Sequence, residues 1–117
     1  MATPEFASFE EFFPYYLAEH ADPVSRKLHY FGTTAGTTVL LYALFTQSWG
    51  LILLYPIIGY GCAWLGHFVF EKNKPATFTY PGWSLMGDYR MLYLAATGQL
   101  EGPLAEGIAR FGRPASR

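Results

Sequence analysis

Uncharged residues form one long run in the middle of the chain, with charged and aromatic segments on either side. No Asp, Glu, Lys or Arg occurs from Leu28 to Phe70. A membrane crossing needs about 20 mostly apolar residues, so this run is long enough for two. The polar cluster TQSWG, at residues 46–50, divides the run near its middle. The pattern therefore predicts a transmembrane hairpin, with one helix from about Leu28 to Phe45 and a second from Trp49 to Phe70.

Small residues recur four positions apart on both predicted helices. The pairs are Gly32 and Gly36, Gly59 and Ala63, and Cys62 and Gly66. This spacing lets two helices approach closely in lipid, although glycine is also common in membrane helices for other reasons. Pro56 is expected to be absorbed as a kink, which membrane helices tolerate.

The segments that flank the hairpin are predicted to be helical as well. The stretch SFEE, residues 8–11, is a capping box, in which the serine oxygen and the glutamate carboxylate are expected to satisfy each other's free amides. Asp22 followed by Pro23 marks another helix start. Residues 83–98 are rich in aromatic residues and leucine. They predict a helix that lies on the membrane surface or is partly inserted. Gly98 is expected to end this helix.

Together these elements predict an all-α fold, an integral membrane helical bundle built on a transmembrane helical hairpin with flanking amphipathic helices. Residues 1–102 are expected to form a single membrane-embedded domain, because 117 residues is a common single-domain size. Residues 103–117, rich in Gly, Pro, Ala and Arg, are expected to be a loosely ordered tail. The small-residue faces also allow a homo-oligomer.

Composition supports contact with lipid and excludes nucleic acid. Hydrophobic residues make up 51 % and charged residues 15 % of the chain, against about 25 % charged residues in an average soluble domain. The net charge of -1 provides no basic surface for a phosphate backbone. Positive charges flank the hairpin and are absent from its turn, which places both ends in the cytoplasm. They are Arg26, Lys27, Lys72 and Lys74.

The hairpin brings distant histidines to one depth. His29 lies nineteen positions before Ser48 in the turn, and His67 lies nineteen after it. At about 1.5 Å per residue, both lie nearly 30 Å from the turn, at the far boundary of the hydrocarbon core. His20 lies just upstream, where a short turn can fold it over the same end. Glu71 is expected on the same helical face as His67, one turn later.

Three imidazoles near a carboxylate match the ligand preferences of a first-row divalent metal ion. Imidazole suits iron, zinc, copper and nickel, and two histidines with one carboxylate suit iron(II) oxygen chemistry. The alternative is that each histidine is an interfacial residue bonded to a backbone carbonyl. The sequence allows three roles for Asp88: binding the metal, orienting a histidine, or pairing with Arg90 or Lys74. The sequence allows two roles for Asn73: capping a helix end, or taking part in the site.

Three stretches carry a resemblance to a known family. They are FPYYLAEHADPVSRKLHYFGT at residues 13–33, GYGCAWLGHFVFEKNKPATFTYP at 59–81 and SLMGDYRM at 84–91. They resemble a small membrane family, long called a domain of unknown function. Its characterised fungal member is an iron(II)-dependent dioxygenase that carries out α-oxidation of 2-hydroxy fatty acids. The resemblance spans about residues 9–98 and is closest to the short bacterial-type members, which implies a bacterial inner membrane.

The resemblance implies an Fe(II) cofactor, O2 and a fatty acid as reactants, and a product acid one carbon shorter. The implied iron ligands are His20, His29 and His67, with Glu71 or Asp88 as the carboxylate. The implied substrate-binding residues are Arg26, Lys27, Asn73 and Arg90. Of these, Arg26, Lys27 or Arg90 can hold the substrate carboxylate by charge-assisted hydrogen bonds. The alternatives are a non-catalytic membrane scaffold or lipid-binding hairpin, and a metal-dependent lipid enzyme of another class.

Overall fold

The structure is a computed structural model that describes residues 5–112, and it contains five α-helices and no strand within that range. The helices are α1 (Phe9–Ala18), α2 (Pro23–Thr46), α3 (Leu54–Leu65), α4 (Pro81–Ala96) and α5 (Glu101–Phe111). Three short helical segments accompany them: η1 (Trp49–Leu53), η2 (Gly66–Glu71), which is a π-helix, and η3 (Ala76–Phe78). The predicted all-α class is confirmed.

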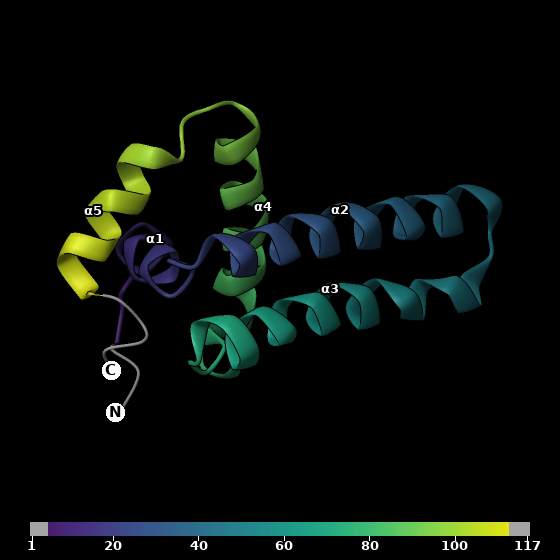
Figure 1. Ribbon diagram of the computed structural model, residues 1–117. Helices are drawn as coiled ribbons and strands as arrows, with labels where there is room; N and C mark the ends of the chain where they lie inside the picture. The colour runs from purple at the N-terminus through teal and green to yellow at the C-terminus, as the bar shows by residue number, and fades with distance from the viewer. Residues whose placement is uncertain (1–4, 113–117) are drawn as a thin grey trace.

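Helices α2 and α3 form the predicted hairpin. Figure 1 shows them side by side, with α1, α4 and α5 gathered at the end away from the turn. The turn begins at Gln47, which ends α2 in the left-handed conformation with a φ of 57°. Close packing explains the glycines of α2: a Cβ on Gly32 would lie 2.8 Å from the Cβ of Cys62, and one on Gly36 would lie 3.2 Å from the carbonyl oxygen of Tyr55.

One of the two arms of the hairpin has the length and composition of a membrane span. Within residues 5–112, the helical run Trp49–Glu71 is long and apolar enough to cross a membrane, and 11 % of its most apolar window is buried inside the protein. The other arm, α2, does not meet that criterion. The threonines and glycines in its middle lower its mean hydropathy. The integral membrane bundle with two crossings therefore stays a prediction.

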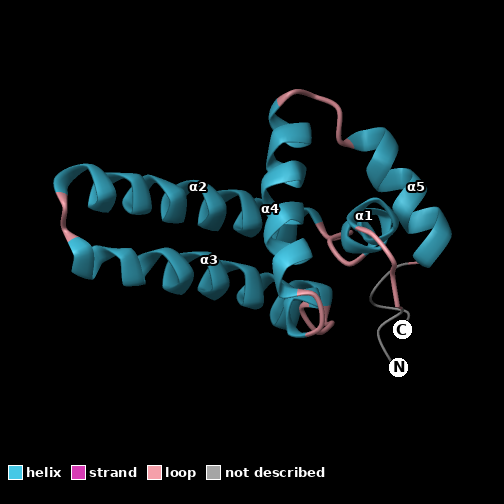
Figure 2. Cartoon of the chain, turned by 180° about the vertical axis from the view of Figure 1, so that it is seen from behind, coloured by secondary structure: helices cyan, strands magenta, loops and turns pink. Residues whose placement is uncertain are grey.

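The hydrophobic core lies outside the hairpin. Phe12, Tyr16 and Leu17 of α1 are almost fully buried, as is Met91 of α4. Helix α5 packs on α1, and Figure 2 shows α4 crossing the base of the hairpin, where it contacts α2. The core thus joins α1, α4 and α5 to the end of the hairpin that carries the histidines.

The local start signals are confirmed. The Ser8 hydroxyl accepts a hydrogen bond from the Glu11 amide, 3.2 Å away, and the Glu11 carboxylate accepts one from the amide of Ala7. Asp22 caps α2 by accepting hydrogen bonds from the amides of Val24 and Ser25. Gly98 follows α4 with a φ of 73°, a conformation that favours glycine.

The expected loosely ordered tail is wrong for residues 103–111, because α5 covers them. Pro103 stands in the first turn of α5, where its missing amide hydrogen costs no helical hydrogen bond. Glu101 near the start and Arg110 near the end complement the helix dipole. Gly107 faces α1 so closely that a Cβ on it would meet the carbonyl of Pro14. Residues 113–117 lie outside the described residues.

Candidate metal centre

The three histidines come from three different elements and meet at the base of the hairpin. His20 follows the end of α1, His29 lies in the second turn of α2, and His67 lies in the π-helix η2. Their exposed fractions are 1 %, 3 % and 3 %. One nitrogen from each ring lies within 4.8 Å of the others, and the Nε2 atoms of His20 and His29 are 3.0 Å apart. The predicted convergence is confirmed.

The Nδ1 atoms of His20 and His29 are held by backbone carbonyls one helical turn back. His20 Nδ1 lies 2.5 Å from the carbonyl oxygen of Tyr16, and His29 Nδ1 lies 2.8 Å from that of Ser25. A carbonyl oxygen only accepts, so each Nδ1 carries the proton and donates it. Each Nε2 therefore presents a lone pair to the other ring.

His67 is held in the same tautomer by a side chain. Its Nδ1 lies 2.7 Å from the Oδ1 of Asn73. The Nδ2 of Asn73 donates to the carbonyl oxygen of Glu19 at 3.1 Å. This second hydrogen bond fixes the amide orientation, because only the NH2 end can donate. His67 therefore also presents the Nε2 lone pair.

This donor set fits a first-row divalent metal ion. Lone pairs on two nitrogens 3.0 Å apart repel each other unless a cation or a proton lies near them. Metal-binding histidines commonly donate their other ring N–H to a carbonyl or a side-chain acceptor, as all three do here. The cavity between the rings measures about 10 Å³, which is close to the volume that a single water centre needs. The site thus has room for an ion.

Burial keeps His20 in the form that binds metal. The pKa of His20 lies well below its ordinary value, first because of burial and then because of repulsion from the neighbouring His29 and His67. The ring is therefore neutral around pH 7. Metals bind the neutral form of imidazole, so no proton has to be removed first.

Asp88 lies at the wall of the histidine cavity. It comes from α4, and its Oδ1 accepts a hydrogen bond from the hydroxyl of Tyr16. Burial raises the pKa of Asp88 to about 7. Its carboxyl group is therefore poised to exchange a proton near neutral pH.

Glu71 is not brought to the histidines. Its Oε2 accepts a hydrogen bond from the amide of Asp22 at 2.8 Å, and it does not line the histidine cavity. The expectation assumed α-helical geometry, in which residues four apart share a face. Residues 66–71 instead form a π-helix, and the Glu71 carboxylate at its end bonds to the start of α2.

The expected substrate-binding cations do not line the histidine cavity. The guanidinium of Arg26 donates to the carbonyls of His20 and Ala21, at 2.9 Å each, and so closes the turn between α1 and α2. Lys27 lies on a separate groove beside Arg26. Arg90 forms an ion pair with Glu10 at 3.2 Å on the surface. None of these three cations lines the histidine cavity.

Sequence reasoning missed two residues of the site. Tyr16 stacks on His20 with ring centroids 4.1 Å apart. The Ser84 hydroxyl is buried, lines the histidine cavity and has no hydrogen-bond partner among the described residues. The signal was present in the stretch SLMGD, because Ser84, Gly87 and Asp88 share one face of a helix. Gly87 belongs there because a Cβ would come within 2.9 Å of the Tyr16 ring.

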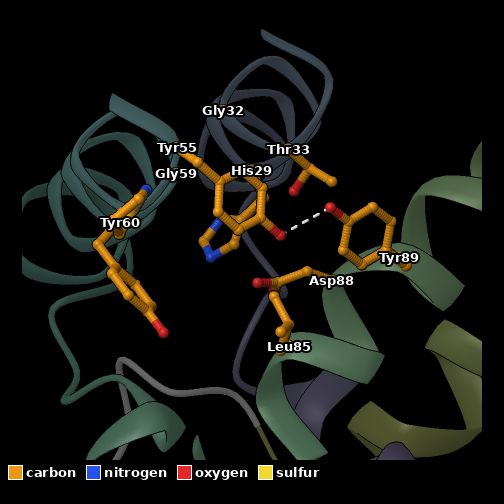
Figure 3. A pocket seen from close by; sticks show the side chains of 10 residues that line it. His29, Gly32, Thr33, Tyr55, Gly59, Tyr60, Leu85, Asp88 and Tyr89 are labelled. Atoms are coloured by element: carbon orange, nitrogen blue, oxygen red, sulfur yellow. Dashed lines mark hydrogen bonds between the residues drawn. The ribbon is translucent and has the colours of Figure 1, made fainter. Parts of the chain in front are cut away.

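A second cavity adjoins the first between α2, α3 and α4. It measures about 90 Å³. His29 and Asp88 belong to its wall and to the wall of the histidine cavity. Figure 3 shows both side chains facing the space between the helices, with the Tyr55 and Tyr89 hydroxyls bonded at 2.7 Å. The histidine cluster thus borders a larger and mostly apolar space.

Comparison with known proteins identifies the family. The family described as 2-hydroxy-palmitic acid dioxygenase Mpo1-like matches residues 6–100. No curated protein and no solved structure gave a significant match. The matched range holds all three histidines, Asn73, Ser84 and Asp88. This chain therefore belongs to the 2-hydroxy-palmitic acid dioxygenase Mpo1-like family.

Proposed function

We propose that this protein is a membrane-bound, iron(II)-dependent dioxygenase that cleaves 2-hydroxy fatty acids to the acid one carbon shorter. The observation that carries the proposal is the geometry of the three histidines. Each buried ring has its Nδ1 committed to an acceptor and directs Nε2 to one small cavity. The name of the family points to the substrate class.

The proposed reaction balances with O2 as the sole oxidant. A 2-hydroxy acid and O2 give the shortened acid, CO2 and water. The bond between C1 and C2 breaks, and the two carbons together lose four electrons, which reduce O2 fully. No second organic reductant is needed, so the substrate pocket has to hold one organic molecule.

Each residue of the site has its own role in the proposed reaction. His20, His29 and His67 would hold the iron, which when bound supplies the redox chemistry with O2. The partnerless Ser84 hydroxyl is placed to donate to a substrate oxygen. Asp88, with its pKa raised to about 7, is placed to accept the proton of the substrate 2-hydroxyl. The Tyr16 hydroxyl orients that carboxyl group.

The placement of the site suits an amphiphilic substrate. Large apolar side chains are exposed along the hairpin, including Phe45 at 90 %, Leu53 at 69 % and Ile57 at 64 %. Extended apolar surfaces of this kind mark membrane contact. Arg26, Lys27, Lys72 and Lys74 lie at the opposite end from the turn, which supports both termini being cytoplasmic. A fatty acid in the membrane would present its head group at the depth of the histidines.

The experiment is anaerobic purification followed by metal analysis and turnover. Protein loaded with iron(II) and given O2 should convert 2-hydroxypalmitic acid to pentadecanoic acid, measured by gas chromatography and mass spectrometry. His67→Ala should lose both iron and product, whereas the exposed-loop variant Lys74→Ala should retain both. Iron-loaded wild-type protein that forms no shortened acid would refute the proposal.

A zinc-dependent lipid hydrolase is the second candidate, because three neutral imidazoles are also a ligand set of catalytic zinc. It predicts that the purified protein retains zinc in preference to iron and acts on lipid esters without O2. A non-catalytic scaffold predicts neither metal retention nor a thermal shift on adding iron(II). The same purified sample therefore separates the three functions.

A further inference from the structure

We propose that the cavity between α2, α3 and α4 binds the first part of the substrate acyl chain, and that Gly59 determines how much chain it admits. The inference rests on the proposed function for the identity of the substrate. It concerns residues beyond the histidine cluster and has a readout that does not depend on turnover.

The cavity begins at the candidate reaction centre and leads away from it. His29 and Asp88 stand at the end that it shares with the histidine cavity. From there its walls follow α2 to Thr33 and α3 to Tyr55, toward the turn of the hairpin. A chain attached to a head group at the histidines would therefore run parallel to the hairpin.

The walls are mostly apolar, and the hydroxyls of the two tyrosines at the far end are bonded to each other. Leu85 and Pro56 contribute aliphatic surface. At the far end the Tyr89 hydroxyl is bonded to the Tyr55 hydroxyl at 2.7 Å and to the Thr37 hydroxyl at 2.6 Å. Because these hydroxyls satisfy one another, the rings of both tyrosines line the space as apolar faces (Figure 3). Such a lining suits methylene groups rather than a sugar or a phosphate.

Gly59 is the place in this wall where a side chain is missing without a packing reason. A Cβ on Gly59 would meet nothing within 4 Å, whereas one on Gly32 in the opposite wall would collide with Cys62. Glycine in a helix interior also costs stability relative to alanine. The absence of a side chain at Gly59 therefore keeps space open and is not required by helix packing.

The test uses Gly59→Leu with Gly61→Leu as the matched control. Gly61 is on the same helix, is exposed and does not line the cavity, and a Cβ on it would also meet nothing within 4 Å. A 2-hydroxy fatty acid with a diazirine in its chain is photo-crosslinked to the metal-loaded protein in detergent. Labelled peptides are mapped, and labelling that excess 2-hydroxypalmitic acid removes is counted as specific.

We expect specific labelling of α3 and α4 peptides around Tyr60 and Leu85 in the wild-type protein. Gly59→Leu should reduce it at least ten-fold, and Gly61→Leu should leave it unchanged. Turnover by Gly59→Leu should fall at least ten-fold more for a 16-carbon than for a 4-carbon 2-hydroxy acid. Leu85→Phe against the exposed neighbour Met86→Phe repeats the comparison on α4, in case Gly59→Leu does not fold.

The two proposals fail in different ways. Specific labelling that both Gly59→Leu and Leu85→Phe leave unchanged, or its absence from the wild-type protein, overturns the acyl-chain site even if the enzyme is active. Labelling that follows the expected pattern in a protein without turnover supports the acyl-chain site and refutes the dioxygenase.

Discussion

The Nδ1 of His67 and the Oδ1 of Asn73 lie 2.7 Å apart, and the same amide donates to the carbonyl oxygen of Glu19. Asn73 thus ties the π-helix that carries His67 to the residue that precedes His20. One side chain fixes the tautomer of one candidate ligand and the position of the backbone beside another. Through these two hydrogen bonds Asn73 positions the histidines.

Removing this acceptor should weaken metal binding without removing a ligand. Asn73→Leu is expected to lower iron(II) or cobalt(II) affinity about 10- to 100-fold, the usual cost of losing such an outer hydrogen bond. Asn73→Asp keeps an oxygen for His67 and should lose less. Competition with a chelating dye measures both values. An affinity of Asn73→Leu equal to that of the exposed-loop variant Lys74→Ala would argue against the positioning role.

Glu71 distinguishes the observed geometry from the sequence-based expectation. Glu71→Gln should bind metal with wild-type affinity, within about three-fold, because the amide oxygen can still accept the Asp22 hydrogen bond. His67→Ala should lose metal under the same conditions. A loss of metal from Glu71→Gln comparable to that from His67→Ala would show that the glutamate is a ligand after all. Metal content of the purified variants decides the question.

The metal-free protein should lose stability as the pH falls below about 6.5. The pKa of His20 is lowered in the folded state, while an unfolded histidine has a pKa of about 6.5. Below that value the unfolded chain binds more protons, so protonation favours unfolding. The contribution is fully present above pH 6.5 and is lost on acidification.

Thermal unfolding of chelator-treated protein between pH 5 and 8 measures this effect. We expect the wild-type Tm to fall by several degrees across the acidic half of the range. The change of Tm with pH should be smaller in His20→Gln. A slope that His20→Gln does not change would assign the acid sensitivity to other groups.

The glycines of α2 should be required for hairpin packing. Gly32→Ala places a Cβ 2.8 Å from the Cβ of Cys62 and should cost about 1–3 kcal/mol of unfolding free energy. Cys62→Gly should recover part of that loss in the double variant, because it removes the colliding atom. Gly61→Ala has nothing within 4 Å and should be neutral or stabilising. Chemical denaturation in detergent measures the wild-type protein, the two single variants, their double variant and Gly61→Ala, and additive effects of Gly32→Ala and Cys62→Gly would contradict the contact.

The convergence of His29 and His67 was predictable from the hairpin, because both lie nineteen positions from Ser48 in the turn. The position of Glu71 was not predictable in the same way, because its carboxylate accepts a hydrogen bond from the Asp22 amide, 49 positions away along the chain. The π-helix at residues 66–71 was not predictable either, because six residues are too few to show a change in the period of the hydrophobic pattern.

The sequence by itself determined the all-α class, the hairpin, its turn and the helix starts at Ser8 and Asp22. These features depend on residues that are near one another along the chain, and their hydrogen bonds are local. Tertiary structure alone decided that Arg26, Lys27 and Arg90 do not line the histidine cavity, that Ser84 and Tyr16 join the histidines, and that α5 packs on α1. Which distant side chains meet depends on how the helices cross, and crossing geometry is set by the packing of whole faces rather than by any single spacing.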